Sequence, residues 1–237
     1  MQVIIEKDYE QMSRTAMQLL LGLMYQPKKV HLAITAGSTP KRLYELLSAE
    51  MKAKTPLENV TYYNFDEIPI GNEKWGVTIS NLKQMYFEPA GIKEEQVHAL
   101  DMFNYTTHDK VIAERGGLDA MLLGIGADGH FCGNLPGTTK FGDETVRVSI
   151  KTRPDIREIL ISEVGGDERK VSDYYVTMGP KSVMQAKHII LFANGKKKAE
   201  IIKRAFFGPV TEDVPASVLQ LHPNLTLLLD KEAASEL

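Results

Sequence analysis

Cysteine, excess positive charge and long apolar runs are all scarce in this chain of 237 residues. The single cysteine, Cys132, excludes an internal disulfide and fits a reducing compartment. The formal net charge of -3 leaves no basic footprint for nucleic acid. No apolar run approaches the ~20 residues of a membrane span, and acids close behind the first apolar residues argue against a signal peptide. We therefore predict a soluble, cytoplasmic protein with no membrane or nucleic-acid partner.

Apolar patterns with the period of strands alternate with patterns of helical period along the chain. The predicted strands are 3–5, 30–36, 60–65, 118–125, 145–150, 174–178, 188–193 and 225–229. The predicted helices are 8–25, 37–47, 79–87, 107–115, 197–207 and 216–221. This alternation predicts a single α/β domain over residues 1–237, with a mostly parallel sheet and helices on both faces. The charged segment 152–171, which contains two adjacent glycines, is expected to form a mobile lid.

Right-handed crossovers place the loops that follow parallel strands along one edge of the sheet. The most informative of these loops follows the apolar run 118–125, where glycines lead directly into Asp128, Gly129 and His130. A buried strand that ends in a glycine turn and presents an acid and an imidazole is typical of sites in open α/β sheets. The alternative is an ordinary turn in which Asp128 caps a helix and His130 has no role.

A second loop, Gly37-Ser38-Thr39-Pro40, follows the predicted strand 30–36. The glycine allows the backbone to come close to a ligand, and the next residues offer hydroxyls and free N–H groups at a helix N-terminus. This combination favours an anion site, although a plain capped helix would have the same sequence. The loop has neither the Gly-Lys-Ser/Thr of a Walker P-loop nor a dinucleotide fingerprint.

A third loop carries the run Gly195-Lys196-Lys197-Lys198. Lysines in the first turn of a helix oppose the helix macrodipole. A phosphate bound between backbone amides and one lysine would explain them, and a solvated charge run is the alternative.

The acid pair Asp66-Glu67 ends the predicted strand 60–65. A carboxylate there, beside the Gly37 loop, could act as a general base whose pKa is set by burial. Together with Asp128 and His130, it predicts proton transfer on a phosphorylated small molecule without a cofactor.

Two residues near these loops have two interpretations each. Trp75, in the irregular segment 68–78, either covers a pocket or is a packing anchor. Cys132 is either a nucleophile or a small apolar filler, and the second is favoured because the sequence identifies no activating partner.

The motifs AGSTP, NFDE, GIGADGH, GKKKA and LQLHPN, in this order, resemble those of the glucosamine-6-phosphate deaminase/isomerase family. The 6-phosphogluconolactonases are relatives with the same fold. The resemblance covers nearly the whole chain, and several motifs in order are far more specific than any one. It implies a modified Rossmann-like α/β domain, a phosphosugar substrate and no required metal or cofactor. The implied reaction converts glucosamine 6-phosphate, or a close epimer, to the ketose 6-phosphate and ammonia.

The resemblance also implies roles for individual residues. Asp66 matches the family's base, which moves a proton between C2 and C1 of the ring-opened sugar. His130 matches the ring-opening histidine, and Asp128 matches its partner carboxylate. The phosphate-binding positions of the family match Gly37, Ser38, Thr39 and Lys198. A phosphate-binding arginine is expected in the lid, where Arg157 and Arg169 are both candidates. The resemblance leaves open the epimer, an allosteric ligand and assembly into a homo-oligomer.

The sequence departs from the deaminase pattern after the DGH triplet. Deaminases continue into Phe-Asn-Glu-Pro, whose glutamate completes a relay with the histidine, whereas this chain has Leu135 at that position. Leucine cannot accept a proton or orient an imidazole. Asp143 and Glu144 are candidates to replace the missing carboxylate.

Two alternative functions follow from the same fold. In a lactonase, the DGH histidine would activate water and would need no relay glutamate. Ser80-Asn81 resembles a lactonase feature, but lactonases usually carry arginine where this chain has Ile68, and the segment 219–224 resembles a deaminase ending. A phosphosugar-binding regulator without turnover is a second alternative, which the lack of a basic patch and of a further helical domain disfavours.

Overall fold

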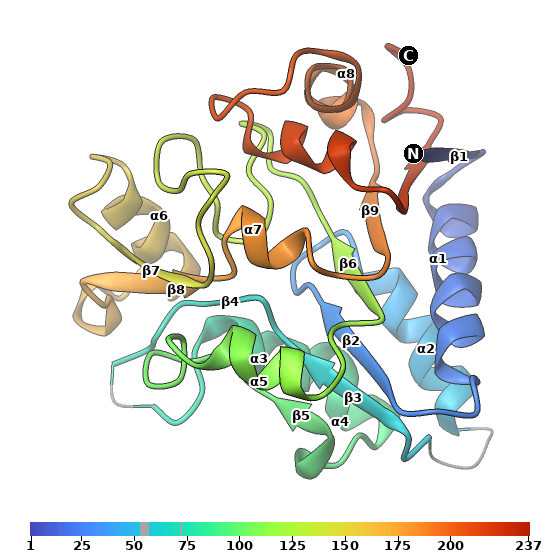
Figure 1. The fold of residues 1–237 in the computed structure, drawn as a ribbon, viewed down its shortest axis with the longest axis horizontal. Coiled ribbons are helices and arrows are strands. Elements are labelled where there is room, and N and C mark those ends of the chain that lie inside the picture. Colours follow the sequence, from blue (N-terminus) through green and yellow to red (C-terminus); the bar gives the residue numbers. More distant parts are fainter. Residues whose placement is uncertain (53–56, 72) are drawn as a thin grey trace.

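The computed structural model describes residues 1–52, 57–71 and 73–237. Its centre is a seven-stranded sheet with the order β1-β10-β9-β6-β2-β3-β5, in which every neighbouring pair is parallel (Figure 1). Its strands are β1 (Gln2–Glu6), β2 (Val30–Ile34), β3 (Val60–Tyr63), β5 (Val97–His98), β6 (Ala120–Leu123), β9 (Ile189–Ala193) and β10 (Leu225–Asp230). The predicted parallel α/β architecture is therefore confirmed.

Helices cover both faces of this sheet because consecutive strand residues point to opposite sides. Met121 and Leu123 of β6 belong to one buried core, whereas Ala120 and Leu122 belong to the other. The first core includes residues of α5 (His108–Glu114), α7 (Pro180–Val183) and α8 (Ala199–Phe207). The second includes residues of α1 (Tyr9–Met24), α2 (Lys41–Lys52), α3 (Val77–Leu82) and its continuation as a π-helix (Lys83–Phe87), with α4 (Glu88–Ala90) packed beside them.

A second, three-stranded sheet lies beside the first and was not predicted. It consists of β4 (Asp66–Glu67), β8 (Tyr174–Thr177) and β7 (Val146–Ser149), all antiparallel. The prediction that 145–150 and 174–178 belong to the mostly parallel sheet is therefore wrong. The alternating burial of β7, with Val148 inside and its neighbours more exposed, is the pattern of an antiparallel sheet with one solvated face.

The predicted lid segment 152–171 contains a regular helix, α6 (Ile156–Glu163), and a short 3-10 turn (Glu168–Lys170). Ile156 and Leu160 of α6 pack with Tyr175 of β8 and form a small core of their own. Figure 1 shows α6, β7 and β8 together on the side of the molecule away from α1 and α2. The mobility of this segment stays a prediction.

Other differences concern short elements. The two-residue strands β4 and β5 and the helix α7 were not predicted, and the predicted helix 216–221 is a 3-10 helix (Pro215–Leu221).

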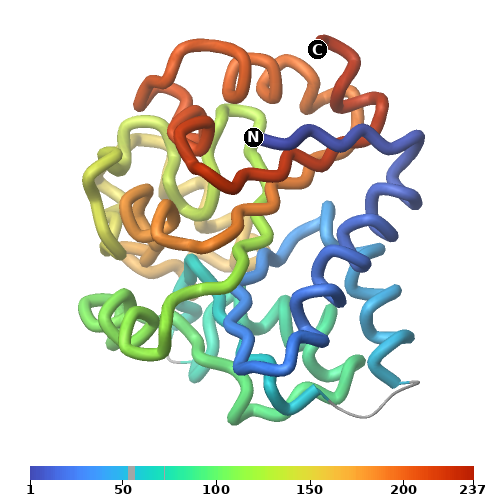
Figure 2. The backbone as a smooth tube through the Cα atoms, turned by 45° about the vertical axis from the view of Figure 1, so that its right-hand side comes forward, coloured from blue at the N-terminus to red at the C-terminus, as the bar shows by residue number. Residues whose placement is uncertain are grey.

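No helix within the described ranges is long and apolar enough to cross a membrane. The two ends of the chain meet, because β1 pairs with β10 (Figure 2).

Candidate active site

A cleft of about 580 Å³ opens at the carboxyl ends of β2, β3 and β6. This is the edge at which open α/β sheets bind ligands. Its other wall comes from α6 and from the loop between β6 and β7. Six of the seven predicted site residues line it: Gly37, Ser38, Thr39, Asp66, His130 and Lys198. The seventh, Asp128, contacts the ring of His130.

Asp66 is the carboxylate of the acid pair that faces the cleft. Its Oδ1 accepts a hydrogen bond of 3.1 Å from the hydroxyl of Thr78, at the start of α3. Burial raises the pKa of Asp66 to about 6, against the opposing effects of Thr78 and His130. An acid with a pKa near the working pH can both accept and return a proton, which is what a general acid–base group needs.

Glu67 does not line the cleft, and its carboxyl accepts hydrogen bonds from main-chain N–H groups at the start of α3. Its Oε1 accepts from the N–H groups of Ile68 and Thr78 at 2.9 and 2.7 Å, and its Oε2 accepts from Ile79 at 3.1 Å. Burial raises the pKa of Glu67 to about 8 in spite of these bonds. The two neighbouring acids therefore have separate roles, one in the cleft and one at a helix start.

His130 is oriented by Asp128. Its Nδ1 lies 2.6 Å from Oδ1 of Asp128, and its main-chain N–H donates to the same oxygen at 3.1 Å. The pKa of Asp128 is about 2, because the bonds from His130 outweigh partial burial. The ionised carboxylate only accepts, so Nδ1 carries the proton that it shares with Asp128, and no described residue is bonded to Nε2, the second ring nitrogen. A Cβ at Gly126 would lie 2.2 Å from ring atoms of His130, so this glycine gives the imidazole its space.

The loop before α2 presents unused donors to the cleft. Gly37 has a φ of +109°, a conformation that favours glycine. Among the described residues, no acceptor binds the N–H groups of 37–39 or the hydroxyls of Ser38 and Thr39. Tyr9, which sequence reasoning missed, holds the loop: its hydroxyl donates to the Thr39 carbonyl at 2.8 Å and accepts from the Arg42 N–H at 3.1 Å.

The lysines of the run 196–198 differ in their surroundings, and both predicted alternatives, a lysine at the site and solvated lysines, occur. Lys196 and Lys197 are exposed, whereas Lys198 lines the cleft and donates to the Ile125 carbonyl at 2.6 Å. Burial lowers the pKa of Lys198, and Asp128 opposes that effect. The turn depends on Gly195, whose φ is +83° and whose N–H donates to both carboxylate oxygens of Asp230.

The two candidate lid arginines are not in the cleft. Arg157 pairs with Glu168 at 3.1 Å, and Arg169, exposed to solvent, pairs with Asp167 at 2.8 Å. Among the described lining residues, Lys198 is the one with a permanent positive charge. The expectation of a phosphate-binding arginine at Arg157 or Arg169 is therefore not met in this conformation.

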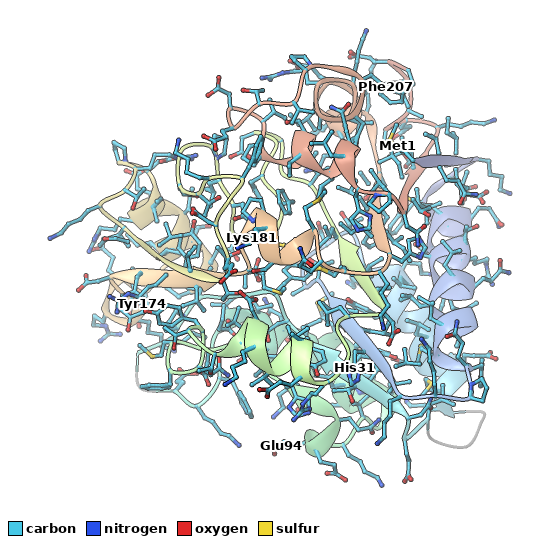
Figure 3. The ribbon with its side chains drawn as sticks, in the orientation of Figure 1. Met1, His31, Glu94, Tyr174, Lys181 and Phe207 are labelled. Carbon is cyan, nitrogen blue, oxygen red and sulfur yellow. The ribbon has the colours of Figure 1, made fainter. Side chains whose placement is uncertain are left out.

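The two proposed replacements for the relay glutamate also lie elsewhere. Asp143 accepts from the main-chain N–H of Lys140 at 2.8 Å, and Glu144 pairs at 2.8 Å with Lys181 of α7 (Figure 3). Neither lines the cleft, whereas the apolar Leu135 does. A different carboxylate, Glu163 at the end of α6, lines the cleft and was missed because the segment 152–171 lacked a clear pattern in the sequence.

The residues with two interpretations are now assigned by their surroundings. Cys132 is packed against the core, and burial raises the pKa of its thiol, so it is a filler rather than a nucleophile. Trp75 packs on the second core with the Lys74 ammonium 4.4 Å from its ring centre. His31 lies at the end of β2 away from the cleft (Figure 3).

Within residues 1–52, 57–71 and 73–237, no group of three or more His, Cys, Asp or Glu side chains could hold a metal ion. What the cleft combines is a loop with unused N–H and hydroxyl donors, a lysine, an acid with a raised pKa and an oriented imidazole. The fold and site thus define an α/β enzyme built for acid–base chemistry on a small anionic molecule.

Comparison with known proteins identifies the family. The profile described as glucosamine-6-phosphate isomerases/6-phosphogluconolactonase matches residues 7–227, and the chain belongs to this family. A glucosamine-6-phosphate deaminase of Halalkalibacterium halodurans is 32% identical over 242 residues, which cover 98% of this chain and 96% of that protein.

Solved structures agree with this assignment. The structure of a monomeric glucosamine-6-phosphate deaminase has a TM-score of 0.84 at 27% identity and covers 100% of both chains. A 6-phosphogluconolactonase from Trypanosoma cruzi has a TM-score of 0.75 at 22% identity, covering 100% of this chain and 96% of that one. The second likeness concerns the fold alone.

Proposed function

We propose that this enzyme converts glucosamine 6-phosphate to fructose 6-phosphate and ammonia. The observation that carries the proposal is Asp66, a partly buried carboxyl whose pKa is raised to about 6, in the same cleft as the oriented imidazole of His130. Water is consumed, the C2 amine leaves as ammonia and the phosphate is unchanged. Full-length relatives described as glucosamine-6-phosphate deaminases support the substrate.

The proposed roles follow from the geometry. The free donors of 37–39 and the Lys198 ammonium bind the phosphate, which anchors the substrate away from its reacting carbons. His130, whose Nε2 is free, accepts a hydroxyl proton as the ring opens. Asp66 then removes the C2 proton and delivers it to C1, which converts the ring-opened 2-amino aldose to the 2-imine. Water hydrolyses this imine, so that C2 becomes the ketone carbonyl and the nitrogen leaves as ammonia.

The lining of the cleft favours this reaction over lactone hydrolysis. Ile68 lies in the cleft at the position where the lactonase pattern would have an arginine. Lactone hydrolysis by His130 and water would also leave Asp66 without a function, since no carbon acid is deprotonated.

A paired assay tests the proposal. One arm supplies glucosamine 6-phosphate and follows ammonia and fructose 6-phosphate, and the other supplies 6-phosphogluconolactone and follows acid release above the spontaneous rate. We expect turnover in the first arm, and a D66N protein purified in the same way controls for contaminating enzymes. Lactone hydrolysis without ammonia release would contradict the proposal, as would binding of the phosphosugar without any product.

A further inference from the structure

One face of α6 forms part of the cleft wall. Ile156, Ile159, Leu160 and Glu163 all line the cleft, and they follow the i, i+3, i+4, i+7 spacing of a single helical stripe. The first three are apolar, and Ile156 and Leu160 are buried. Glu163 therefore lies where the stripe would continue with an apolar side chain, and it presents a carboxylate to the cleft.

Glu163 is exposed to solvent, and its place in α6 gives its charge no favourable partner. It is the last residue of α6, at the negative end of the helix dipole, and the last turn contains no basic residue. No ion pair or hydrogen bond among the described residues uses its carboxylate, and its negative charge acts on Asp66. Two carboxylates thus line one cleft with only Lys198 as a fixed cation in the described wall.

We infer that Glu163 is a specificity-determining residue that binds the positively charged C2 amino group of the substrate. The inference rests on the proposed function, because Asp66 acts on the hydrogen of C2 and the amine is bonded to the same carbon. Glu163 lines the same cleft as Asp66, so its carboxylate is placed to meet the substituent on C2. Leu135 and the isoleucines of α6 line the same cleft, but Glu163 itself is exposed, so its contact with the amine is that of a partly exposed ion pair.

The inference gives each carboxylate that lines the described cleft a separate role. With Leu135 in place of the family's glutamate, these carboxylates are Asp66 and Glu163. One is the proton shuttle, and the other selects an amino sugar over a neutral sugar. A 2-hydroxy sugar phosphate would leave Glu163 unpaired and would gain nothing from it.

Two ring-opened analogues that cannot react separate amine recognition from catalysis. 2-Amino-2-deoxyglucitol 6-phosphate and glucitol 6-phosphate differ only in the group on C2, which is charged in the first at about pH 7. Calorimetry would measure both dissociation constants for the wild type, for E163Q and for E158Q. Glu158 is an exposed carboxylate on the same helix that does not line the cleft, so E158Q is the matched control.

The wild type and E158Q should bind the amino analogue more tightly than glucitol 6-phosphate. In E163Q the ratio of the two dissociation constants should shrink about two- to fivefold, the range of a partly exposed ion pair. Affinity for glucitol 6-phosphate should not change. An unchanged preference in E163Q, or an equal loss of affinity for both analogues, would overturn the role of Glu163. If the wild type released ammonia in the same study, the proposed function would still stand. A wild type that binds neither analogue and releases no ammonia would overturn both.

Discussion

Asp66 and Glu67 are chemically similar neighbours, and the backbone sends them to different parts of the molecule. Consecutive residues of a strand point to opposite faces, so only one of the pair can reach the cleft. Asp66 keeps a single side-chain donor, Thr78, whereas Glu67 accepts three main-chain N–H groups. The acid that can change its protonation state during a reaction is therefore Asp66, and Glu67 is occupied by the structure.

At the residue scale, D66N removes the proton acceptor while keeping the shape of the side chain. We expect kcat to fall by about 10²–10⁴-fold, the usual contribution of a general base. Binding of glucitol 6-phosphate should change little, because Asp66 does not contact the phosphate in the proposed mode. Steady-state kinetics and calorimetry measure the two effects, and a variant with wild-type kcat would exclude Asp66 as the base.

The raised pKa of Asp66 also predicts a pH profile. The carboxylate must be ionised to accept the C2 proton, so kcat/KM should be half of its plateau value near pH 6, level off at higher pH and fall as the pH drops below about 6. The substrate phosphate titrates near pH ~6 as well. The pH dependence of glucitol 6-phosphate binding is the control, and an acid limb that appears equally in binding would belong to the phosphate instead.

At the element scale, α3 depends on a side chain that precedes it. Its N-terminal N–H groups at Thr78 and Ile79 are buried and are satisfied by the carboxyl of Glu67. Gly76 allows this approach, since a Cβ there would lie 2.4 Å from Oε1 of Glu67. The same helix carries Thr78, which donates to Asp66, so the start of α3 connects stability to the site.

Replacing Glu67 with alanine should therefore destabilise the fold. E67A leaves buried N–H groups without an acceptor, which costs roughly 1–3 kcal/mol in the free energy of unfolding. E67Q keeps an acceptor oxygen and should lose less. Urea denaturation with a common slope measures both, and equal stability of E67A and the wild type would show that water replaces the carboxyl.

At the scale of the whole molecule, the cleft exists because two sheets meet. The large parallel sheet supplies the Gly37 loop, the His130 turn and Lys198, whereas β4 and α6 supply Asp66 and Glu163. A ligand that contacts both parts is bound by the folded protein and not by the unfolded chain, so it must raise the unfolding free energy.

Phosphosugar binding should accordingly stabilise the protein through Lys198. Glucitol 6-phosphate at about 100 times its Kd should add about 2.7 kcal/mol to the unfolding free energy. K198A should lose most of this gain at the same ligand concentration, and K197A, its exposed neighbour in the same turn, should keep it. Chemical denaturation with and without ligand provides the measurement. An equal increase in unfolding free energy in K198A and K197A would show that Lys198 does not bind the phosphate.

Much of this arrangement was predictable because it depends on local pattern. The alternation of apolar periods predicts the parallel sheet and its two helical layers, and the glycine turns after the strands predict which loops reach one edge. Six of the seven chosen residues line the cleft for that reason: chain direction alone brings the loops after β2, β3, β6 and β9 together.

The rest depended on contacts between segments distant in the sequence. The paired strands β4 and β8 lie more than a hundred residues apart in the sequence. Because β4 has only two residues, it has almost no apolar pattern from which a strand could be predicted. Glu163 looks like any surface glutamate until α6 packs against Tyr175 and turns its stripe toward the cleft. The sequence by itself determined the sheet, its edge and the residue types of the site. The tertiary structure decided which acid shares the cleft with the imidazole and which charges face one another, because burial and electrostatic distance are set by packing between elements.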